Sequence, residues 1–296
     1  MTKITLLGCG LMGTPMAHRL LASGYPLSVW NRTPGKAQAL GASGAIVHTT
    51  PTAAAQDADI VITMLADGDV VESLLFDPAL PGVASVLKKG ALVIDMSSIL
   101  PAQAKDHAAR LAQLGVNTLD APVSGGTLGA EAGTLAIMVG GLEVDFDRAR
   151  TVLGALGHPV HVGPAGSGQL AKLANQMIVG ITIGAVAEAL LMAERGGADP
   201  AKVRQALRGG FAESRVLEVH GQRMVEGDFT KRGALSTQLK DLRNALHTSA
   251  ELAFDAPITT QLTALYESAA SHGLGELDQS ALFKELQGRQ IGRSMS

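Results

Sequence analysis

The sequence predicts an N-terminal α/β domain with a doubly wound, mostly parallel sheet, followed by an all-helical C-terminal domain. Short apolar segments alternate with helix-like segments over the first half of the chain, a pattern typical of parallel strands joined by helices. A cluster of glycine, proline and serine occupies residues 163–168, and strand-like segments stop after it. We therefore place one domain at residues 1–163 and a second at residues 164–296, joined by a long helix.

Each element of the first domain is predicted from its own composition. The strands should be short and apolar, because helices cover both faces of a parallel sheet. Segments of this kind are Ile4–Leu7, Leu27–Trp30, Ile60–Thr63, Leu92–Ile94 and Val116–Asp120. Helices are expected at Met12–Ala22 and Ala102–Leu114, the second of which follows Pro101, a residue that a first helical turn tolerates.

The second domain is predicted to begin with one long helix, Gln169–Arg195, that is apolar almost all round. Gly180 and Gly184 would let a neighbouring helix approach it closely. Because a domain of ~130 residues can bury only part of so apolar a helix, we predict a homo-oligomer, a dimer or tetramer, formed through it. Further helices are expected near Ala201–Leu207, Leu235–Leu252, Thr259–Ser271 and Ser280–Leu286.

Composition argues against several classes of protein. The chain has 296 residues, a net charge of −3 and one cysteine, which speaks against a nucleic-acid-binding surface, a disulfide scaffold and a cysteine-rich metal site. The eight histidines show no metal-ligand spacing, so no metal site is expected. The apolar start is too short for a signal peptide, and no uninterrupted run reaches the ~18 apolar residues of a membrane span. A soluble cytoplasmic protein with a small-molecule ligand is expected.

The turn after the first predicted strand carries a dinucleotide-binding pattern. Gly8, Gly10 and Gly13 form a Gly-x-Gly-x-x-Gly spacing, and Leu11 and Met12 occupy the two variable positions before the last glycine. The first glycine permits a tight turn, the second lets a pyrophosphate approach the backbone, and the third lets the helix pack on the strand. An ordinary strand–helix turn is the alternative, but the position between strand and helix favours a Rossmann domain.

The end of the second predicted strand indicates which dinucleotide binds. An acidic residue there would bind the ribose 2′-hydroxyl of NAD. This chain has Asn31, Arg32 and Thr33 instead, with Lys36 one helical turn later. A guanidinium fits the oxygens of a 2′-phosphate, and no carboxylate is present to repel it. We predict that NADP(H) is preferred and NAD(H) is possible; the alternative is that Arg32 is a solvated surface residue.

A serine and two glycines follow the last predicted strand. Ser124, Gly125 and Gly126 should lie at the carboxyl edge of the sheet, where open α/β sheets bind ligands. Their hydroxyl and N–H groups could form a cradle for a substrate carboxylate, or the segment could be a flexible turn.

The start of the long helix carries polar residues on one face. Lys172, Asn175 and Gln176 are spaced so that they share that face. A lysine early in an apolar helix is unfavourable unless it lines a cavity or has a partner, and partial burial favours proton exchange near neutral pH. Taken alone, a lysine on the helix surface is the simpler interpretation.

Five ordered motifs together resemble the β-hydroxyacid dehydrogenase family, to which 3-hydroxyisobutyrate dehydrogenase belongs. They are residues 8–13, Asp95–Ser98, Asp120–Gly126, Lys172–Gln176 and Lys240-Asp241. The resemblance implies that Lys172 is the catalytic residue and that Ser124, Gly125, Gly126 and Asn175 bind substrate. It also implies cofactor contacts at residues 8–13, Met64, Leu65, Ser98 and Lys240, beside the contacts expected at Asn31, Arg32 and Thr33 from their position. Asp241 matches a family position near the active site and has no assigned role.

The resemblance implies hydride transfer between NADP(H) and a small β-hydroxy acid or its semialdehyde. Residues 131–141, 172–176 and 209–217 are similar to the branch that reduces tartronate semialdehyde (2-hydroxy-3-oxopropionate) to D-glycerate. Oxidation of 3-hydroxyisobutyrate and reduction of glyoxylate or succinic semialdehyde are the alternatives among enzymes. A non-catalytic NADP-binding sensor is the alternative of another class.

Overall fold

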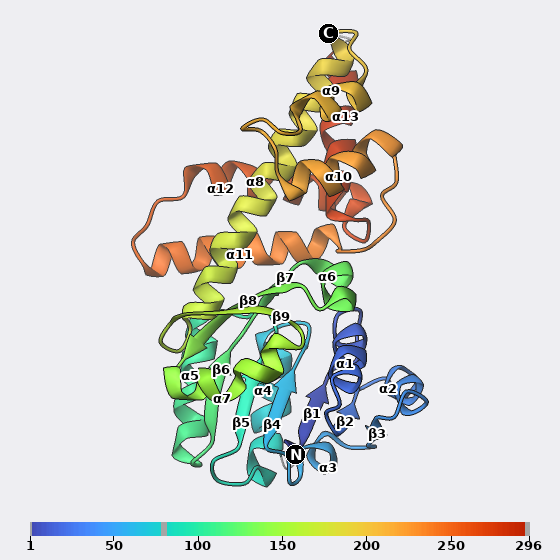
Figure 1. Cartoon of the computed structure of the whole chain (residues 1–296). Helices are drawn as coiled ribbons and strands as arrows, with labels where there is room; N and C mark the ends of the chain where they lie inside the picture. The colour runs from blue at the N-terminus through green and yellow to red at the C-terminus, as the bar shows by residue number, and fades with distance from the viewer. Residues whose placement is uncertain (1, 78–81, 294–296) are drawn as a thin grey trace. The chain divides into compact units, whose positions relative to one another are not determined.

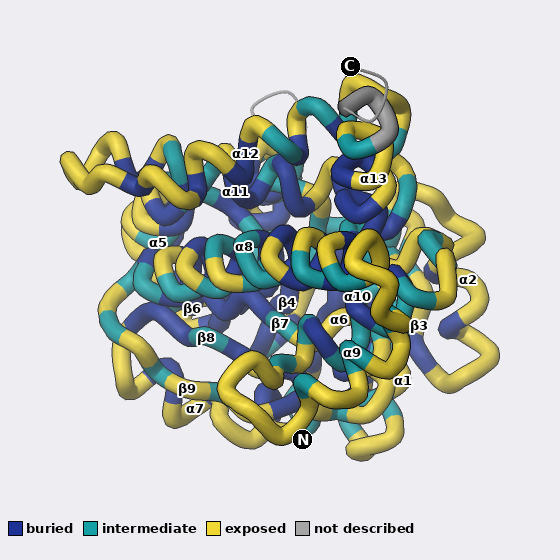
Figure 2. The backbone as a smooth tube through the Cα atoms, turned by 90° about the horizontal axis from the view of Figure 1, so that it is seen from above, coloured by how far each residue is buried: buried dark blue, intermediate teal, exposed yellow. Residues whose placement is uncertain are grey.

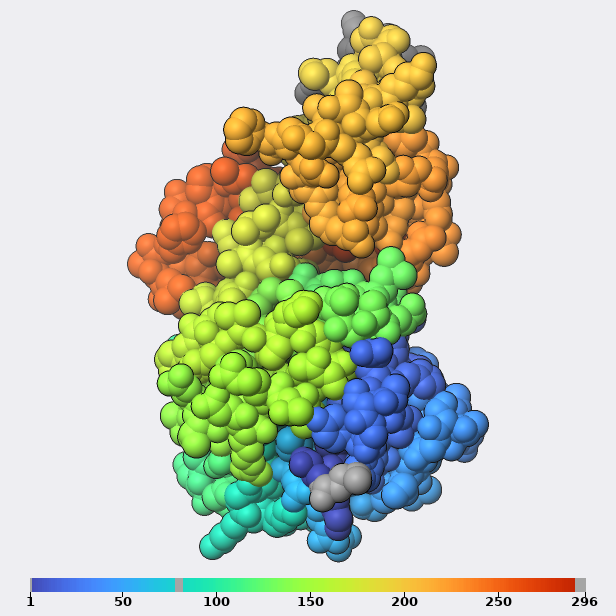
Figure 3. All heavy atoms as spheres, in the orientation of Figure 1, coloured from blue at the N-terminus to red at the C-terminus, as the bar shows by residue number. Residues whose placement is uncertain are grey.

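The computed structural model describes residues 2–77 and 82–293, with side chains up to residue 290 (Figure 1). The chain divides into two compact units, one ending at Lys172 and the other beginning at Leu173. The first unit runs from blue to yellow-green in the space-filling view, and its side chains pack against one another (Figure 3). The division lies within a helix, nine residues beyond the boundary expected from the breaker cluster.

One sheet organises the first unit. Its strands are β1 (Ile4–Leu7), β2 (Leu27–Trp30), β3 (Ile46–Val47), β4 (Ile60–Thr63), β5 (Leu92–Asp95), β6 (Asn117–Asp120), β7 (Val123–Ser124), β8 (Leu135–Gly141) and β9 (Gly157–Gly163). The order is β3-β2-β1-β4-β5-β6-β8-β7, and β9 pairs with β8. The strands from β3 to β6 in this order are parallel, β8 runs antiparallel to β6 and β7, and β9 is parallel to β8. This confirms the predicted doubly wound, mostly parallel sheet.

Helices cover both faces of this sheet. They are α1 (Gly13–Ala22), α2 (Pro34–Gly41), α3 (Pro51–Ala55), α4 (Gly68–Phe76), α5 (Pro101–Gln113), α6 (Gly126–Ala132) and α7 (Glu143–Gly154). Successive side chains of β1 point to opposite faces, so Leu6 joins the core formed with α1, α2 and α7, whereas Leu7 joins the core formed with α3, α4 and α5. Such two-sided burial explains why the strands are continuous apolar segments.

The predicted strands agree closely with the observed ones where the strand is buried. β1, β2 and β4 have the predicted bounds, β5 is one residue longer, and β6 begins one residue later. β3, β7, β8 and β9 are not among the five predicted strands. β9 alternates buried or half-buried with exposed residues, and β3 is exposed, so neither has the continuous apolar composition by which buried strands are found.

Helices make up the second unit in the part of the chain that the structure describes. They are α8 (Ser167–Arg195), which begins in the first unit, and α9 (Pro200–Leu207), α10 (Arg215–Glu226), α11 (Leu235–Glu251), α12 (Pro257–Ala269) and α13 (Leu282–Arg293). A side chain at Gly184 would lie 2.8 Å from Leu262 of α12, and one at Gly180 would lie 2.8 Å from Gln238 of α11. The predicted close approach of neighbouring helices to α8 is therefore confirmed. α10 was not predicted.

Helix α8 has a partly exposed apolar surface. Leu170, Ile178 and Met192 are 45%, 67% and 74% exposed, and Figure 2 shows exposed and buried segments alternating along the helix. By length and composition alone α8 could cross a membrane, and 39% of its most apolar window is buried inside the protein. One helix of this kind is weak evidence for a membrane span, because the core helix of a soluble protein passes the same test of length and composition.

Candidate active site

The glycine-rich turn after β1 shows which glycines the fold itself requires. Gly8 has a φ of +109°, and a Cβ there would lie 2.3 Å from the carbonyl oxygen of Met64. A Cβ at Gly13 would lie 1.9 Å from the carbonyl oxygen of Gly8. At Gly10, by contrast, a Cβ would meet nothing within 4 Å. The space over Gly10 fits a bound pyrophosphate, which needs a close approach to this backbone.

The segment after β2 is held to this turn by Asn31. The Cys9 N–H donates to Asn31 Oδ1 at 2.9 Å, and Asn31 Nδ2 donates to the Thr33 carbonyl at 2.9 Å. Arg32 and Lys36 are exposed beside it. Cys9 is buried, and burial raises the pKa of its thiol to about 11, so this side chain acts as a small apolar residue in the turn. The side chain of Asn31 thus shapes the loop, and the cationic side chains remain available to a phosphate.

The ends of β4 and β5 meet beside the same turn. The Leu65 N–H donates to Ser97 Oγ at 2.9 Å, and Gly8 approaches both Met64 and Leu65. The structure therefore brings the predicted cofactor contacts Met64 and Leu65 next to the glycine-rich turn, with Ser98 directly after Ser97. Ser97 is fully buried and was not singled out in the sequence, where only its neighbour Ser98 was named.

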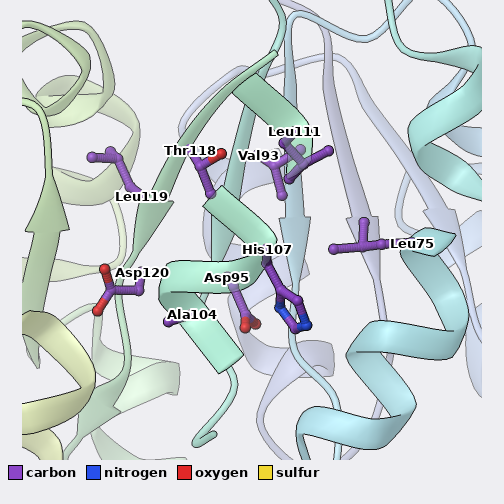
Figure 4. Close-up of a pocket in the computed structure, with 9 residues that line it drawn as sticks. All are labelled: Leu75, Val93, Asp95, Ala104, His107, Leu111, Thr118, Leu119 and Asp120. Atoms are coloured by element: carbon purple, nitrogen blue, oxygen red, sulfur yellow. The ribbon is translucent and has the colours of Figure 1, made fainter. Parts of the chain in front are cut away.

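Asp95 is a second buried group at the end of β5. Its Oδ1 accepts hydrogen bonds from Thr63 Oγ1 at 2.8 Å and from the Ser97 N–H at 3.0 Å. Burial raises the pKa of this carboxyl. Asp95 also lines a cavity of about 10 Å³ with His107 and Thr118, and Figure 4 shows these side chains together with Asp120 of the neighbouring strand. A cavity of this size has room for about one water molecule.

The predicted carboxylate cradle lies between β7 and α6. Ser124 is half-buried and pairs with Ala136 of β8, while Gly125 and Gly126 have φ values of +130° and +63°. Backbone of this shape favours glycine, so the two glycines have a conformational reason to be there. Ser124 thus lies in a short antiparallel strand after β6, and the cradle itself stays a prediction.

The first turn of α8 is bound to the end of β6. Asp120 Oδ1 accepts from the Gly166 N–H, and its Oδ2 accepts from the Gln169 N–H, both at 2.8 Å. Burial raises the pKa of Asp120 to about 6, against the lowering effect of these two hydrogen bonds. Lys172 follows one turn later and is 9% exposed. In the sequence Asp120 was noted only as the start of a motif and Gln169 was missed, because no local pattern marks either contact.

In the second unit, α11 holds the turn of α8 that carries Asn175. Asn175 Nδ2 donates to Gln176 Oε1 at 2.8 Å, and Gln176 Nε2 donates to Asp241 Oδ2 at 2.7 Å. Lys240 Nζ lies 3.2 Å from Asp241 Oδ1. Asp241, whose role the sequence left open, is thus a neighbour of Gln176 and Lys240. Gln238, which also accepts from Gln176 at 2.9 Å, was not foreseen.

A glycine-rich turn at the first strand of a doubly wound sheet is typical of a dinucleotide-binding protein, and here a helical unit follows it. Residues 3–164 match the family described as the NAD binding domain of 6-phosphogluconate dehydrogenase. Residues 166–286 match the family described as NAD-binding of NADP-dependent 3-hydroxyisobutyrate dehydrogenase. The chain belongs to the 3-hydroxyisobutyrate dehydrogenase family, which confirms the resemblance found in its motifs.

Individual relatives agree over nearly the full chain. A 2-hydroxy-3-oxopropionate reductase of Escherichia coli (strain K12) is 43% identical over 286 residues, covering 96% of this chain and 97% of that one. The structure of Mycobacterium tuberculosis 3-hydroxyisobutyrate dehydrogenase with L-serine is 33% identical, with a TM-score of 0.88 and coverage of 97% and 99%. The structure of Psf3 in complex with NADP⁺ and 2-OPP is 26% identical, with a TM-score of 0.87 and coverage of 96% and 99%.

Proposed function

We propose that this protein reduces tartronate semialdehyde to D-glycerate with NADP(H). The observation that carries the proposal is the 43% identity, over almost the whole chain, to a 2-hydroxy-3-oxopropionate reductase. Lys172, at the start of an apolar helix and nearly buried, is the residue to which we assign the acid–base chemistry. NADP(H) supplies the hydride when it is bound.

The residues of this chain supply orientation and proton transfer. The hydroxyl of Ser124 and the N–H groups of Gly125 and Gly126 would bind the substrate carboxylate and so fix the direction of the carbonyl group. As the carbonyl carbon is reduced, negative charge develops on its oxygen. The Lys172 ammonium stabilises that charge and donates a proton to the oxygen. Asn175, one turn further along α8, is proposed to contact the substrate hydroxyl.

The preference for NADP(H) is part of the proposal. Asn31 has an amide where NAD-binding proteins have a carboxylate for the ribose 2′-hydroxyl. Its amide group is hydrogen-bonded to the turn and to the following backbone. Arg32 and Lys36 are exposed beside it and carry the charge that a 2′-phosphate requires. The relative Psf3 forms a complex with NADP⁺, which supports this choice.

A comparison of substrates tests the proposal. Purified protein is assayed for NADPH oxidation with tartronate, methylmalonate and succinic semialdehydes and with glyoxylate. We expect the highest kcat/KM with tartronate semialdehyde, and Lys172→Ala should lower kcat roughly 10²–10⁴-fold while the Kd for NADPH stays the same. A higher kcat/KM with another aldehyde acid would change the proposed substrate but not the proposed reaction. A wild-type kcat in Lys172→Ala would show that Lys172 takes no part in the reaction.

Two other functions give different results in the same assay. A 3-hydroxyisobutyrate dehydrogenase, supported by the M. tuberculosis relative, would prefer methylmalonate semialdehyde. An NADP-binding sensor would bind NADPH tightly and oxidise it with none of the substrates. Lys172 near the start of α8 and Asn175 one turn later favour an enzyme.

We also propose that the protein is a cytoplasmic homo-oligomer, a dimer or tetramer, assembled through α8. The exposed Leu170, Ile178 and Met192 give this helix an apolar surface that a second copy would cover. Light scattering of the purified protein measures its mass, and Ile178→Glu should shift it toward the monomer. Binding of the wild type to lipid vesicles, with a monomeric mass in solution, would contradict this assignment.

A further inference from the structure

Both carboxylate oxygens of Asp120 accept hydrogen bonds from the backbone of one turn. Asp120 is the last residue of β6 and is 4% exposed. Its two oxygens accept from the N–H groups of Gly166 and Gln169, which flank the beginning of α8. N–H groups at a helix start lack intrahelical acceptors, so a charged acceptor there fixes both the position and the direction of the first turn.

Gln169 attaches the same turn to the end of β5. Its side chain is fully buried, and its Nε2 donates to the Ser97 carbonyl at 2.8 Å. Its Oε1 accepts from the Ile99 N–H at 3.1 Å. Ser97 in turn accepts from the Leu65 N–H, so a continuous series of hydrogen bonds runs from the end of β4 to α8. Each polar atom of the buried amide group has a backbone partner.

Two glycines let the helix start lie directly against the strands. A Cβ at Gly168 would lie 2.4 Å from the carbonyl oxygens of both Asp120 and Met138. A Cβ at Gly140 of β8 would lie 2.5 Å from Asp120 Oδ1 and 2.7 Å from the Gly168 nitrogen. The backbone of this turn therefore lies directly against β6 and β8, and a side chain at either glycine would displace it from Asp120.

We propose that Asp120 and Gln169 are positioning residues, which hold the first turn of α8 against the ends of β5 and β6 and thereby fix the place of Lys172. The inference rests on the proposed role of Lys172. Lys172 lies three residues beyond Gln169, about 4.5 Å along the helix axis, so a rotation of the anchored turn moves its Nζ directly. A displacement of about 1 Å at a reacting group can cost 10²-fold in rate.

Two substitutions disrupt these contacts and preserve size. Asp120→Asn places an NH2 group against a backbone N–H, because an amide has one acceptor oxygen where the carboxylate has two. Gln169→Met keeps the length of the side chain and removes both of its hydrogen bonds. Asp145→Asn is the matched control: Asp145 is 3% exposed in the first turn of α7 and accepts from Asn117 Nδ2 at 2.6 Å, away from the contacts of Asp120 and Gln169.

We expect both substitutions to lower kcat roughly 10–100-fold and the control to keep the wild-type kcat. The decisive comparison repeats them in Lys172→Ala. Because Asp120 and Gln169 act through the lysine, they should cause no further loss in that background. Equal losses with and without Lys172 would overturn the inference. If Lys172→Ala itself keeps its activity, the proposed function of Lys172 fails instead.

Amide hydrogen exchange of the cofactor-free protein supplies a readout that does not depend on turnover. In Asp120→Asn, the amides of Gly166 and Gln169 should exchange roughly 10-fold faster or more, while those of α7 keep the wild-type rate. Unchanged exchange at these two amides would also overturn the inference. If Asp120→Asn does not fold, Gln169→Met, which removes only neutral hydrogen bonds, gives the same kinetic comparison, with the exchange measured at Ile99.

Discussion

Replacing Asp120 by asparagine should change how the stability of the protein depends on pH. The carboxyl is buried at the end of β6, beside Asp95 of β5 and next to a cavity that His107 of α5 also lines. Burial has the largest effect on its pKa and raises it. The hydrogen bonds from the Gly166 and Gln169 N–H groups lower the pKa, and the negative charge of Asp95 raises it. Asparagine has the same size and no proton to exchange in this range.

The magnitude follows from the difference between the folded and unfolded pKa of Asp120. Its pKa rises from 3.8 to about 6 on folding, so the folded protein holds this proton more tightly than the unfolded chain. The stability that the proton contributes is fully present below about pH 4 and is lost as the pH rises through 6. The complete effect is about 3 kcal/mol, of which about 1.4 kcal/mol falls between pH 5.0 and 7.5.

Urea unfolding of the wild type and Asp120→Asn at pH 5.0 and 7.5 measures this effect. The protein concentration is held constant, because dissociation of an oligomer would also change the midpoint. The wild type should lose about 1.4 kcal/mol relative to the variant on going from pH 5.0 to 7.5. Groups common to both proteins cancel in this difference. A difference that is the same at both pH values, or that changes in the opposite direction, would refute the reasoning.

Four further substitutions test other parts of the structure. Arg32→Ala should raise the Kd for NADPH by a factor of 10 or more and leave that for NADH nearly the same, as measured by cofactor fluorescence; equal changes would remove Arg32 from cofactor choice. Gly10→Ala should fold with wild-type stability yet bind NADPH far more weakly, whereas Gly13→Ala should lose stability, because only the second Cβ meets backbone. Tyr266→Phe should stabilise the protein by about 1 kcal/mol in urea, because the buried hydroxyl has no hydrogen-bond partner among the described residues; a loss of stability would show that the hydroxyl is bonded.

The sequence predicts well the strands that are buried on both faces, and it misses strands such as β8, whose buried residues alternate at first with exposed or half-buried ones. β1, β2 and β4 are covered on both faces or nearly so, and burial on both faces selects a short, continuous apolar segment. In β9, buried or half-buried residues alternate with exposed ones, so its composition is less constrained. This strand pairs with β8. β7 has only two residues, too few for any pattern.

The candidate site also contains residues that a local pattern reveals and residues that only the fold brings together. The spacing of Gly8, Gly10 and Gly13 can be recognised in the sequence, because a local turn imposes it. Gln169 and Ser97 are 72 residues apart, and only the fold brings the end of β5 to the start of α8. Nothing in the composition around either residue records that contact. Lys172 was therefore recognised through resemblance, whereas the side chains that hold its helix became visible only in the structure.

Buried polar groups concentrate where this chain is proposed to do its chemistry. Thr63, Asp95, Ser97 and Asp120 lie at the ends of three neighbouring strands, and Gln169 faces them from α8; all five are at most 5% exposed. Burial of these groups is unfavourable in itself, since it raises the pKa of both carboxyls, and Asp95 Oδ2 has no hydrogen-bond partner in the described part of the chain. What the polar groups provide is direction: each hydrogen bond fixes a backbone atom of a loop or helix end to a particular neighbour. Apolar replacements there should therefore leave the sheet intact, while the loops at the proposed cofactor site and the turn before Lys172 lose their fixed positions. The residues that form the sheet would then be distinct from those that position the proposed active site.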